Sequence, residues 1–111
     1  MSYMFARTKF NRNISEWNVS NVRNMEGMFY SSGFKNFIAS WDVSNVENMN
    51  WMFARAYSFF NNLDFWDTSN VITMESMFYN SGVTPEHVKE WLSYKFVLPL
   101  GTEIDDLFKK A

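Results

Sequence analysis

The residues that could carry out chemistry in this sequence are few, and they begin with a single histidine. His87 has Glu86 and Glu90 close by on a predicted helix, but there is no second histidine and no cysteine to complete a metal site or a catalytic cluster. We therefore interpret His87 as an exposed helix residue. The 4 glycines lie at unrelated positions and form no phosphate-binding loop. The sequence thus predicts no enzyme, no cofactor and no metal.

Two aspartates also occupy corresponding places in the sequence. Asp42 and Asp67 each lie two residues before a serine, and Asn18 lies at the same distance before Ser20. If the two carboxylates face one another, a cation could bridge them. We favour the interpretation that each side-chain oxygen accepts a hydrogen bond from the backbone of a turn.

The composition indicates one domain with an aromatic core. The chain has 111 residues, of which 47% are hydrophobic and 20% aromatic, and its net charge is −2. Its apolar runs are only a few residues long, whereas a membrane-spanning helix needs about 18 or more. We therefore expect no membrane contact. The small negative charge gives no general attraction to nucleic acid.

An internal repeat must position all of these residues. Trp17, Trp41 and Trp66 lie 24 and 25 residues apart. Each follows a phenylalanine by seven positions and an isoleucine or leucine by three, and each precedes a Ser-Asn-Val triplet and then a Met-x-x-Met-Phe group. Met1, Met4 and Phe5 match the end of this unit, so the sequence opens in mid-repeat.

Each unit is predicted to contain one short helix and one short strand. The apolar spacing in residues 22–29 places the side chains on one face of a helix about two turns long, with Ser20 or Asn21 as its N-cap. The alternation in residues 17–19 is typical of a brief strand. Neither element can cover the other's apolar face, so adjacent units must pack together with their tryptophans in one column.

The repeat resembles the BspA-like leucine-rich-repeat family, whose units read much like Phe-Asn-x-x-Ile-x-x-Trp-Asp-Val-Ser-Asn-Val-x-x-Met-x-x-Met-Phe. The resemblance covers about residues 1–83. It implies a short right-handed solenoid of the kind found in bacterial surface proteins, where such repeats are linked to adhesion or protein binding. The expected fold class is therefore an α/β repeat, a leucine-rich-repeat-like solenoid of three-plus coils with a C-terminal helical cap.

The two ends of the repeat region differ in their cover. Residues 84–111 are predicted to form capping helices, the first starting at Thr84-Pro85 and the second after Thr102. The N-terminal end has no such cap, so we expect a self-association edge there, which supports a homodimer or contact with a partner. Its candidate residues are Met1, Met4, Phe5 and Phe10. Alternatively, Met1 and Tyr3 fold over this edge and suffice to cover it.

The aromatic residues that remain outside the repeat frame are candidates for partner binding. Trp51 lies between two core methionines and points away from them on a helix. Phe37 and Phe65 each neighbour a core position in an extended segment, and Tyr30, Tyr57 and Tyr79 fall in the turn after the predicted helix. Several of these aromatic rings could instead fold back over the small core. Arg7 and Arg55 share one repeat position and could form a basic stripe.

These observations leave two classes of function. The first is a non-enzymatic protein-binding repeat module, either an adhesin-type surface fragment or a small binder. An alternative within it is an intracellular inhibitor, for example one encoded by a mobile element, that binds a host protein or a nucleoprotein complex. The second class is direct nucleic-acid binding through the basic residues. As written, the sequence indicates a cytoplasmic protein, or a cell-surface one if it is a fragment of a longer exported protein.

Overall fold

A computed structural model describes residues 1–92 and 94–110 of the chain. Within these residues it contains one α-helix, α1 (Pro85–Trp91), and one short 3-10 helix, η1 (Ile104–Leu107). The strand-like pairings described there are two isolated parallel bridges, Asn24 with Asn48 and Asn48 with Thr73. The prediction of an α/β leucine-rich-repeat-like solenoid of three-plus coils is therefore wrong, because the regular helices and the sheet of that fold are missing from the described residues.

The segments predicted to be two-turn helices are runs of overlapping β-turns. In residues 25–32 the amides of Met28, Tyr30 and Ser32 each donate to the carbonyl three residues earlier, over 3.0 to 3.2 Å. Gly27 and Ser31, the third residues of two of these turns, have φ of 60° and 53°. Such left-handed residues fit a turn and interrupt an α-helix. The mistake has a physical cause, since three-residue turns and helices both place residues three apart on one side.

The amides between these turns bond to the adjacent repeat unit. Every second amide from Met25 to Ser31, four in all, donates to a carbonyl of the following unit over 2.8 to 2.9 Å. The acceptors are Asn48, Asn50, Met52 and Ala54. The amides of Met49, Trp51, Phe53 and Arg55 make the same bonds one unit further on. Because these donors are used between units, the bonds that an α-helix needs within one segment cannot form.

The predicted strands at residues 17–19 and 41–43 are absent as well, and each of these segments lies between two turns. Trp41 donates its backbone amide to Ile38 over 3.0 Å, which bends the chain. Its indole Nε1 donates to the Ile14 carbonyl of the preceding unit over 2.9 Å, and Trp66 bonds to Ile38 in the same way over 3.1 Å. The tryptophans thus join adjacent units through their side chains.

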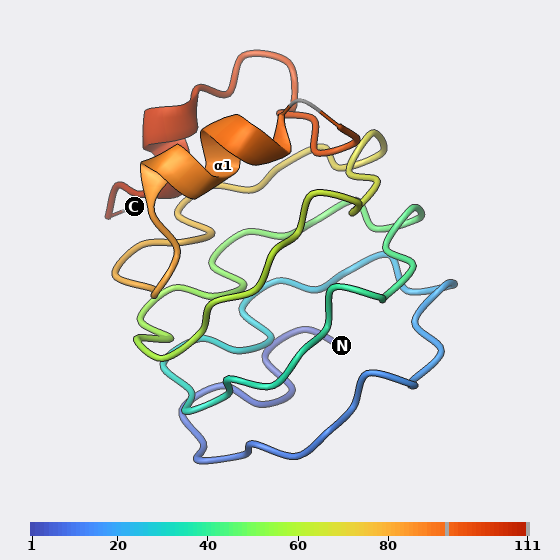
Figure 1. Ribbon diagram of the computed structural model, residues 1–111, viewed down its shortest axis with the longest axis vertical. Helices are drawn as coiled ribbons and strands as arrows, with labels where there is room; N and C mark the ends of the chain where they lie inside the picture. The colour runs from blue at the N-terminus through green and yellow to red at the C-terminus, as the bar shows by residue number, and fades with distance from the viewer. Residues whose placement is uncertain (93, 111) are drawn as a thin grey trace.

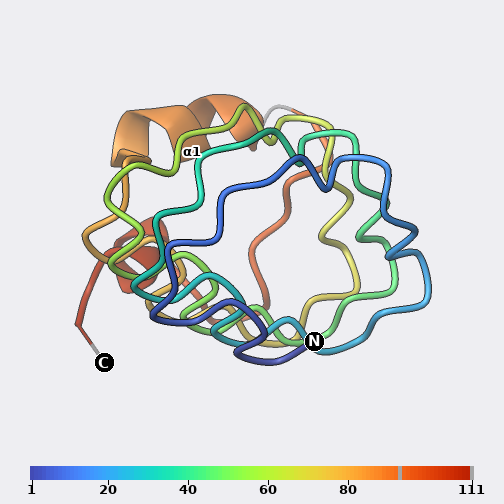
Figure 2. The ribbon, with the colours of Figure 1, turned by 90° about the horizontal axis from the view of Figure 1, so that it is seen from below.

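The core is a row of aromatic rings flanked by buried methionines. The ring centroids of Phe5, Phe29, Phe53 and Phe78 follow one another at 5.7, 5.5 and 5.8 Å. Figure 1 shows the turns of chain one above another, with α1 at the end opposite the N-terminal part. Seen from below in Figure 2, they overlie each other and α1 lies along one side. The core therefore spans all units.

The C-terminal residues cover one end of this core. α1 begins after Thr84 with Pro85 in its first turn, as predicted, and it buries Val88 and Trp91. The helix ends at Trp91, so Phe96 is buried from a following turn. η1 follows the predicted start near Thr102 and buries Leu107. No helix in the described part of the chain has the length and apolar character needed to cross a membrane.

Candidate functional site

Four of the predicted binding residues meet on one flank of the molecule. The Tyr30 and Trp51 rings lie with their centroids 5.6 Å apart, and the Arg7 guanidinium carbon is 5.5 Å from the centroid of Tyr30. Arg55 occupies the repeat position of Arg7, and both have φ of 59°. These side chains come together because the turn runs of adjacent units lie in parallel register, which places equivalent positions side by side.

A small hollow of about 90 Å³ opens at this cluster. Tyr30, Trp51 and Arg55 line it together with Ser76, Tyr79 and Lys110. Ser76 matches Trp51 in the repeat, so aligning the third unit could have identified it. Lys110 lies outside the repeat and carries no sequence signal for this site. Ser76 is buried and its hydroxyl donates to the Lys109 carbonyl over 2.5 Å, which ties the C-terminal segment to the hollow.

The hollow is positively charged and lined largely by aromatic rings. Neither Arg55 nor Lys110 forms an ion pair within residues 1–92 and 94–110, and Arg7 forms none there either. The ion pairs described join Glu86 to Lys89 and Asp106 to Lys109. Since no carboxylate among residues 1–92 and 94–110 lines the hollow, its cations can pair with an acidic group from outside, while the rings pack against the carbon atoms beside that group.

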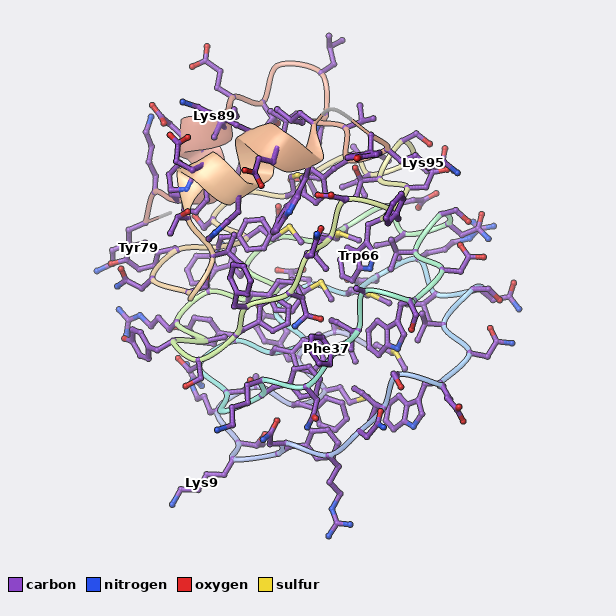
Figure 3. All side chains as sticks on the ribbon, in the orientation of Figure 1. Lys9, Phe37, Trp66, Tyr79, Lys89 and Lys95 are labelled. Atoms are coloured by element: carbon purple, nitrogen blue, oxygen red, sulfur yellow. The ribbon has the colours of Figure 1, made fainter. Side chains whose placement is uncertain are left out.

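The other predicted aromatic residues lie away from this cluster. Phe37 and Phe65 are 74% and 73% exposed, and Tyr57 is exposed too. Phe65 packs beside Tyr94, with ring centroids 5.1 Å apart. In Figure 3 Phe37 lies near the middle of the view and Tyr79 at its left edge, and Phe37, Phe65 and Tyr57 do not line the hollow. The sequence correctly placed Phe37, Phe65 and Tyr57 outside the core. It did not indicate which of the candidate aromatic residues would line the hollow and which would not.

The N-terminal edge is partly covered by its own side chains. Met1, Phe5 and Phe10 are half-buried against the core, and the rings of Phe5 and Phe10 stack at 3.9 Å, whereas Met4 is exposed. The Tyr3 hydroxyl donates to Glu26 Oε2 over 3.3 Å. Partial burial, and next the negative charge of Glu26, raise the pKa of Tyr3. Self-association through this edge stays a prediction.

The matching aspartates act as turn acceptors, which confirms the favoured interpretation. Asp42 Oδ1 accepts hydrogen bonds from the Ser44 hydroxyl and amide over 2.6 and 3.0 Å, and Asp67 does the same with Ser69. These bonds stabilise the carboxylates and lower the pKa of both aspartates below the ordinary 3.8. The described residues contain no group of three His, Cys, Asp or Glu side chains that could hold a metal ion.

His87 is better packed than the sequence indicated. It is half-buried rather than exposed, and its ring meets Phe60 edge-on at 4.5 Å between centroids. Its Nδ1 accepts a hydrogen bond from the backbone amide of Thr84 over 3.1 Å. The side chain therefore caps the start of α1, a role filled more often by Glu or Gln at this position.

Comparison with known proteins gives one family. The family model described as "Mycoplasma protein of unknown function, DUF285" matches residues 1–97. Neither a curated protein nor a solved structure matches the chain.

Proposed function

The chain belongs to the family described as Mycoplasma protein of unknown function, DUF285, and from that premise we propose that it is a non-enzymatic protein-binding module. The binding site is the hollow at Tyr30, Trp51 and Arg55, and it takes an acidic side chain of a partner protein. The observation that carries this proposal is the cluster itself, in which two tyrosines, a tryptophan and two cations with no ion pair to another described residue surround one small hollow.

The residue types at the hollow are those that contribute most at protein interfaces. Tryptophan, tyrosine and arginine are enriched among residues whose truncation costs more than about 2 kcal/mol of binding free energy. Trp51 is already half-buried and in contact with Tyr30, so little side-chain freedom remains to be lost on binding. Arg55 can hold a carboxylate through two parallel hydrogen bonds.

The setting of this function is proposed from the repeat sequence. The Trp-x-Val-Ser-Asn-Val pattern occurs at residues 17–22 and 41–46, and residues 66–71 repeat it with Thr68 in place of valine. This pattern supports a relationship with the BspA-like surface repeats, although the described residues lack the leucine-rich-repeat fold. That relationship favours an adhesin-type fragment of a cell-surface protein. An intracellular inhibitor that binds a host protein or nucleoprotein complex is the alternative setting, and the same hollow would serve it.

A nucleic-acid partner is the second candidate, and Arg7 and Arg55 favour it. They share one repeat position two units apart, and Tyr30 and Trp51 beside them offer stacking surfaces for bases. The net charge of −2 weighs against it. Binding dominated by phosphates would weaken steeply as salt rises, whereas an aromatic protein contact would depend on salt weakly.

The test is capture of partners on immobilised protein at low and high salt, with variants of the hollow. We expect a captured protein to be retained at high salt and to be lost with Trp51→Ala and with Arg55→Gln. Phe65→Ala is the matched control, because it removes an exposed aromatic ring that does not line the hollow. Circular dichroism shows whether each variant keeps its fold. Capture that survives both hollow variants, or that disappears at high salt with nuclease treatment, contradicts the proposal.

A further inference from the structure

The flank that carries the hollow repeats with a period of two units. One repeat position is occupied in four successive units by Tyr3, Gly27, Trp51 and Ser76, whose φ values are 54°, 60°, 61° and 55°. Because equivalent positions of adjacent units are neighbours, each large ring lies beside a small residue of the following unit. The Tyr3–Gly27 pair and the Trp51–Ser76 pair can therefore be compared within one molecule.

The Tyr3–Gly27 pair is filled by its own side chain. The Tyr3 ring packs over the glycine so closely that a Cβ at Gly27 would lie 2.2 Å from Cε1 of the ring. The cation beside this pair also has a contact within the chain, since the Arg7 guanidinium carbon lies 5.5 Å from the centroid of Tyr30.

The Trp51–Ser76 pair cannot close in the same way. A ring placed over Ser76 as Tyr3 lies over Gly27 would collide with the serine Cβ. Ser76 is itself fixed, since it is 2% exposed and its hydroxyl donates to a carbonyl of the C-terminal segment. The Trp51 ring lies against Tyr30 instead, with the ring centroids 5.6 Å apart. Ser76 therefore keeps the hollow open at the place that a ring fills in the other pair.

The lining of the open hollow is rich in hydrogen-bond donors. The side chains of Arg55, Lys110 and Trp51 can only donate, and the hydroxyls of Tyr30 and Tyr79 can donate as well. Because two of these side chains are cations, a ligand that matches the lining carries about two negative charges and several acceptor oxygens. A carboxylate has one charge and two oxygens. A phosphate monoester carries about −1.5 to −2 charges at pH 7 and has three free oxygens.

From this lining we propose that the hollow binds a phosphate monoester carried by a side chain of the partner protein. Arg55 holds two phosphate oxygens through parallel hydrogen bonds, and Lys110 pairs with the remaining charge. A phosphodiester of nucleic acid fits less well, because each of its phosphates carries a single charge. This inference rests on the proposed function and names the acidic group that the hollow takes.

The experiment uses small probes that differ in their acidic group. Phenyl phosphate and phenylacetate share one ring, inorganic phosphate lacks the ring, and an oligothymidylate supplies phosphodiesters. Each probe is titrated into the protein at a pH of about 7.5, where the monoester is mostly a dianion, and at constant salt. Calorimetry measures the affinity, and NMR follows the indole N–H signal of Trp51.

Three protein variants locate the site. Arg55→Gln removes one cation of the hollow. Arg12→Gln is its matched control, because Arg12 is an exposed arginine that does not line the hollow. Ser76→Gly changes no charge but removes the side chain that keeps the hollow open. Circular dichroism shows whether each variant keeps its fold.

We expect phenyl phosphate to shift the Trp51 signal and to bind roughly tenfold or more tightly than each of the other probes. Arg55→Gln should weaken this binding roughly tenfold or more, and Arg12→Gln should change it within about twofold. Ser76→Gly should weaken it as much as Arg55→Gln does, because the Trp51 ring can then fill the hollow. Phosphatase treatment should release a captured partner protein.

The proposal is overturned if phenyl phosphate does not bind, or if another probe binds equally tightly. Equal weakening by Arg55→Gln and Arg12→Gln overturns it too, since that result indicates general attraction between charges. So does unchanged binding in Ser76→Gly, or a captured partner that phosphatase treatment does not release. The proposed function survives these results if capture of a protein still depends on Trp51 and Arg55, so the two failures are distinguishable.

Discussion

At the scale of single residues, tryptophans at the same repeat position differ in burial and in hydrogen bonding from one unit to another. Trp66 is 1% exposed and donates its indole N–H to Ile38, whereas Trp17 is 39% exposed and bonds to no described group. We expect Trp66→Phe to lower the free energy of unfolding by about 1 to 2 kcal/mol, since the Ile38 carbonyl loses one of its two donors and keeps only the Trp41 amide, while the smaller ring fills less of the core. Urea denaturation measures the change.

Trp17→Phe is the matched control for this substitution. It removes the same N–H group from the same repeat position, where no bond is lost. Its expected cost is within about 0.5 kcal/mol. Equal losses for both variants would show that the indole bonds between units do not stabilise the fold.

The aspartates predict a stability change in acid. Hydrogen bonds from Ser44 and Ser69 lower the pKa of Asp42 and Asp67 in the folded protein. Their contribution to stability is therefore fully present above the unfolded pKa, near 3.8, and is lost as pH falls through the lower folded pKa. We expect thermal unfolding temperatures to decrease over this acid range.

Asn18 shows which variant isolates the effect. It makes the same two bonds to Ser20, over 2.6 and 3.0 Å, without a charge that titrates. The double variant Asp42→Asn with Asp67→Asn keeps the acceptors, so its unfolding temperature should decrease less than that of the wild type between pH 5 and pH 2. An identical pH dependence in both proteins would contradict this account.

The sequence predicted the roles of some of these residues correctly, but for others the structure gives a different physical reason. The spacing of Asp42 and Ser44 correctly predicted a local hydrogen bond, because such bonds depend on neighbours in the chain. Trp51 was placed outside the core by assuming a helix, yet it is a turn residue with φ of 61°. Lys110 reaches the hollow through the fold of the C-terminal segment, which no pattern in the sequence encodes.

At the scale of elements, the wrong prediction of helices has a cause in the backbone hydrogen bonds. The amides that a helix would use within one segment can instead donate to the following repeat unit. The Met-x-x-Met-Phe group suits one face of a helix, but a helix this short is marginal alone. Bonding the alternate amides to the next unit is the alternative, and it requires left-handed residues at positions such as Gly27, Trp51 and Ser76. Helix periodicity carries no information about a neighbouring unit. The start of α1 was predictable because Thr84 and Pro85 act locally.

The turn run at Gly27 gives a test of this packing. A Cβ added to Gly27 would lie 2.2 Å from Cε1 of the Tyr3 ring, which packs over this glycine. We expect Gly27→Ala to cost about 1 to 3 kcal/mol of unfolding free energy, from the displaced ring and from the φ of 60°.

A double-mutant cycle separates the two causes. In a Tyr3→Ala background the ring is gone, so Gly27→Ala should keep only the cost of the left-handed backbone, about 1 to 2 kcal/mol. Ser76 already tolerates the equivalent conformation with a side chain. If the cost of Gly27→Ala is unchanged by Tyr3→Ala, the ring moves aside freely and the contact does not restrict this position.

At the scale of the whole molecule, the register of the repeat was the most informative part of the sequence. The constant offset of the tryptophans and phenylalanines correctly indicated that equivalent residues of adjacent units would be neighbours. It could not indicate the direction of the hydrogen bonds, because that direction follows from turn geometry rather than from side-chain pattern.

The continuous row of phenylalanine rings predicts that the molecule unfolds as one unit. Phe53 lies between Phe29 and Phe78, and Phe78 contacts Trp91 of α1 at 5.8 Å between ring centroids. Phe53→Ala therefore removes a link shared by all parts of the core, and we expect a cost of about 3 to 5 kcal/mol. The exposed Phe65 is the control, and Phe65→Ala should cost within about 0.5 kcal/mol.

Calorimetry then decides whether the cap is a separate unit. If the rings couple α1 to the repeat units, the wild type shows one heat-absorption peak whose calorimetric and van't Hoff enthalpies agree. Phe53→Ala should move this single peak to lower temperature. A second peak that stays in place in this variant would mean that α1 and η1 unfold independently, and the row of rings would then stabilise only the repeat units.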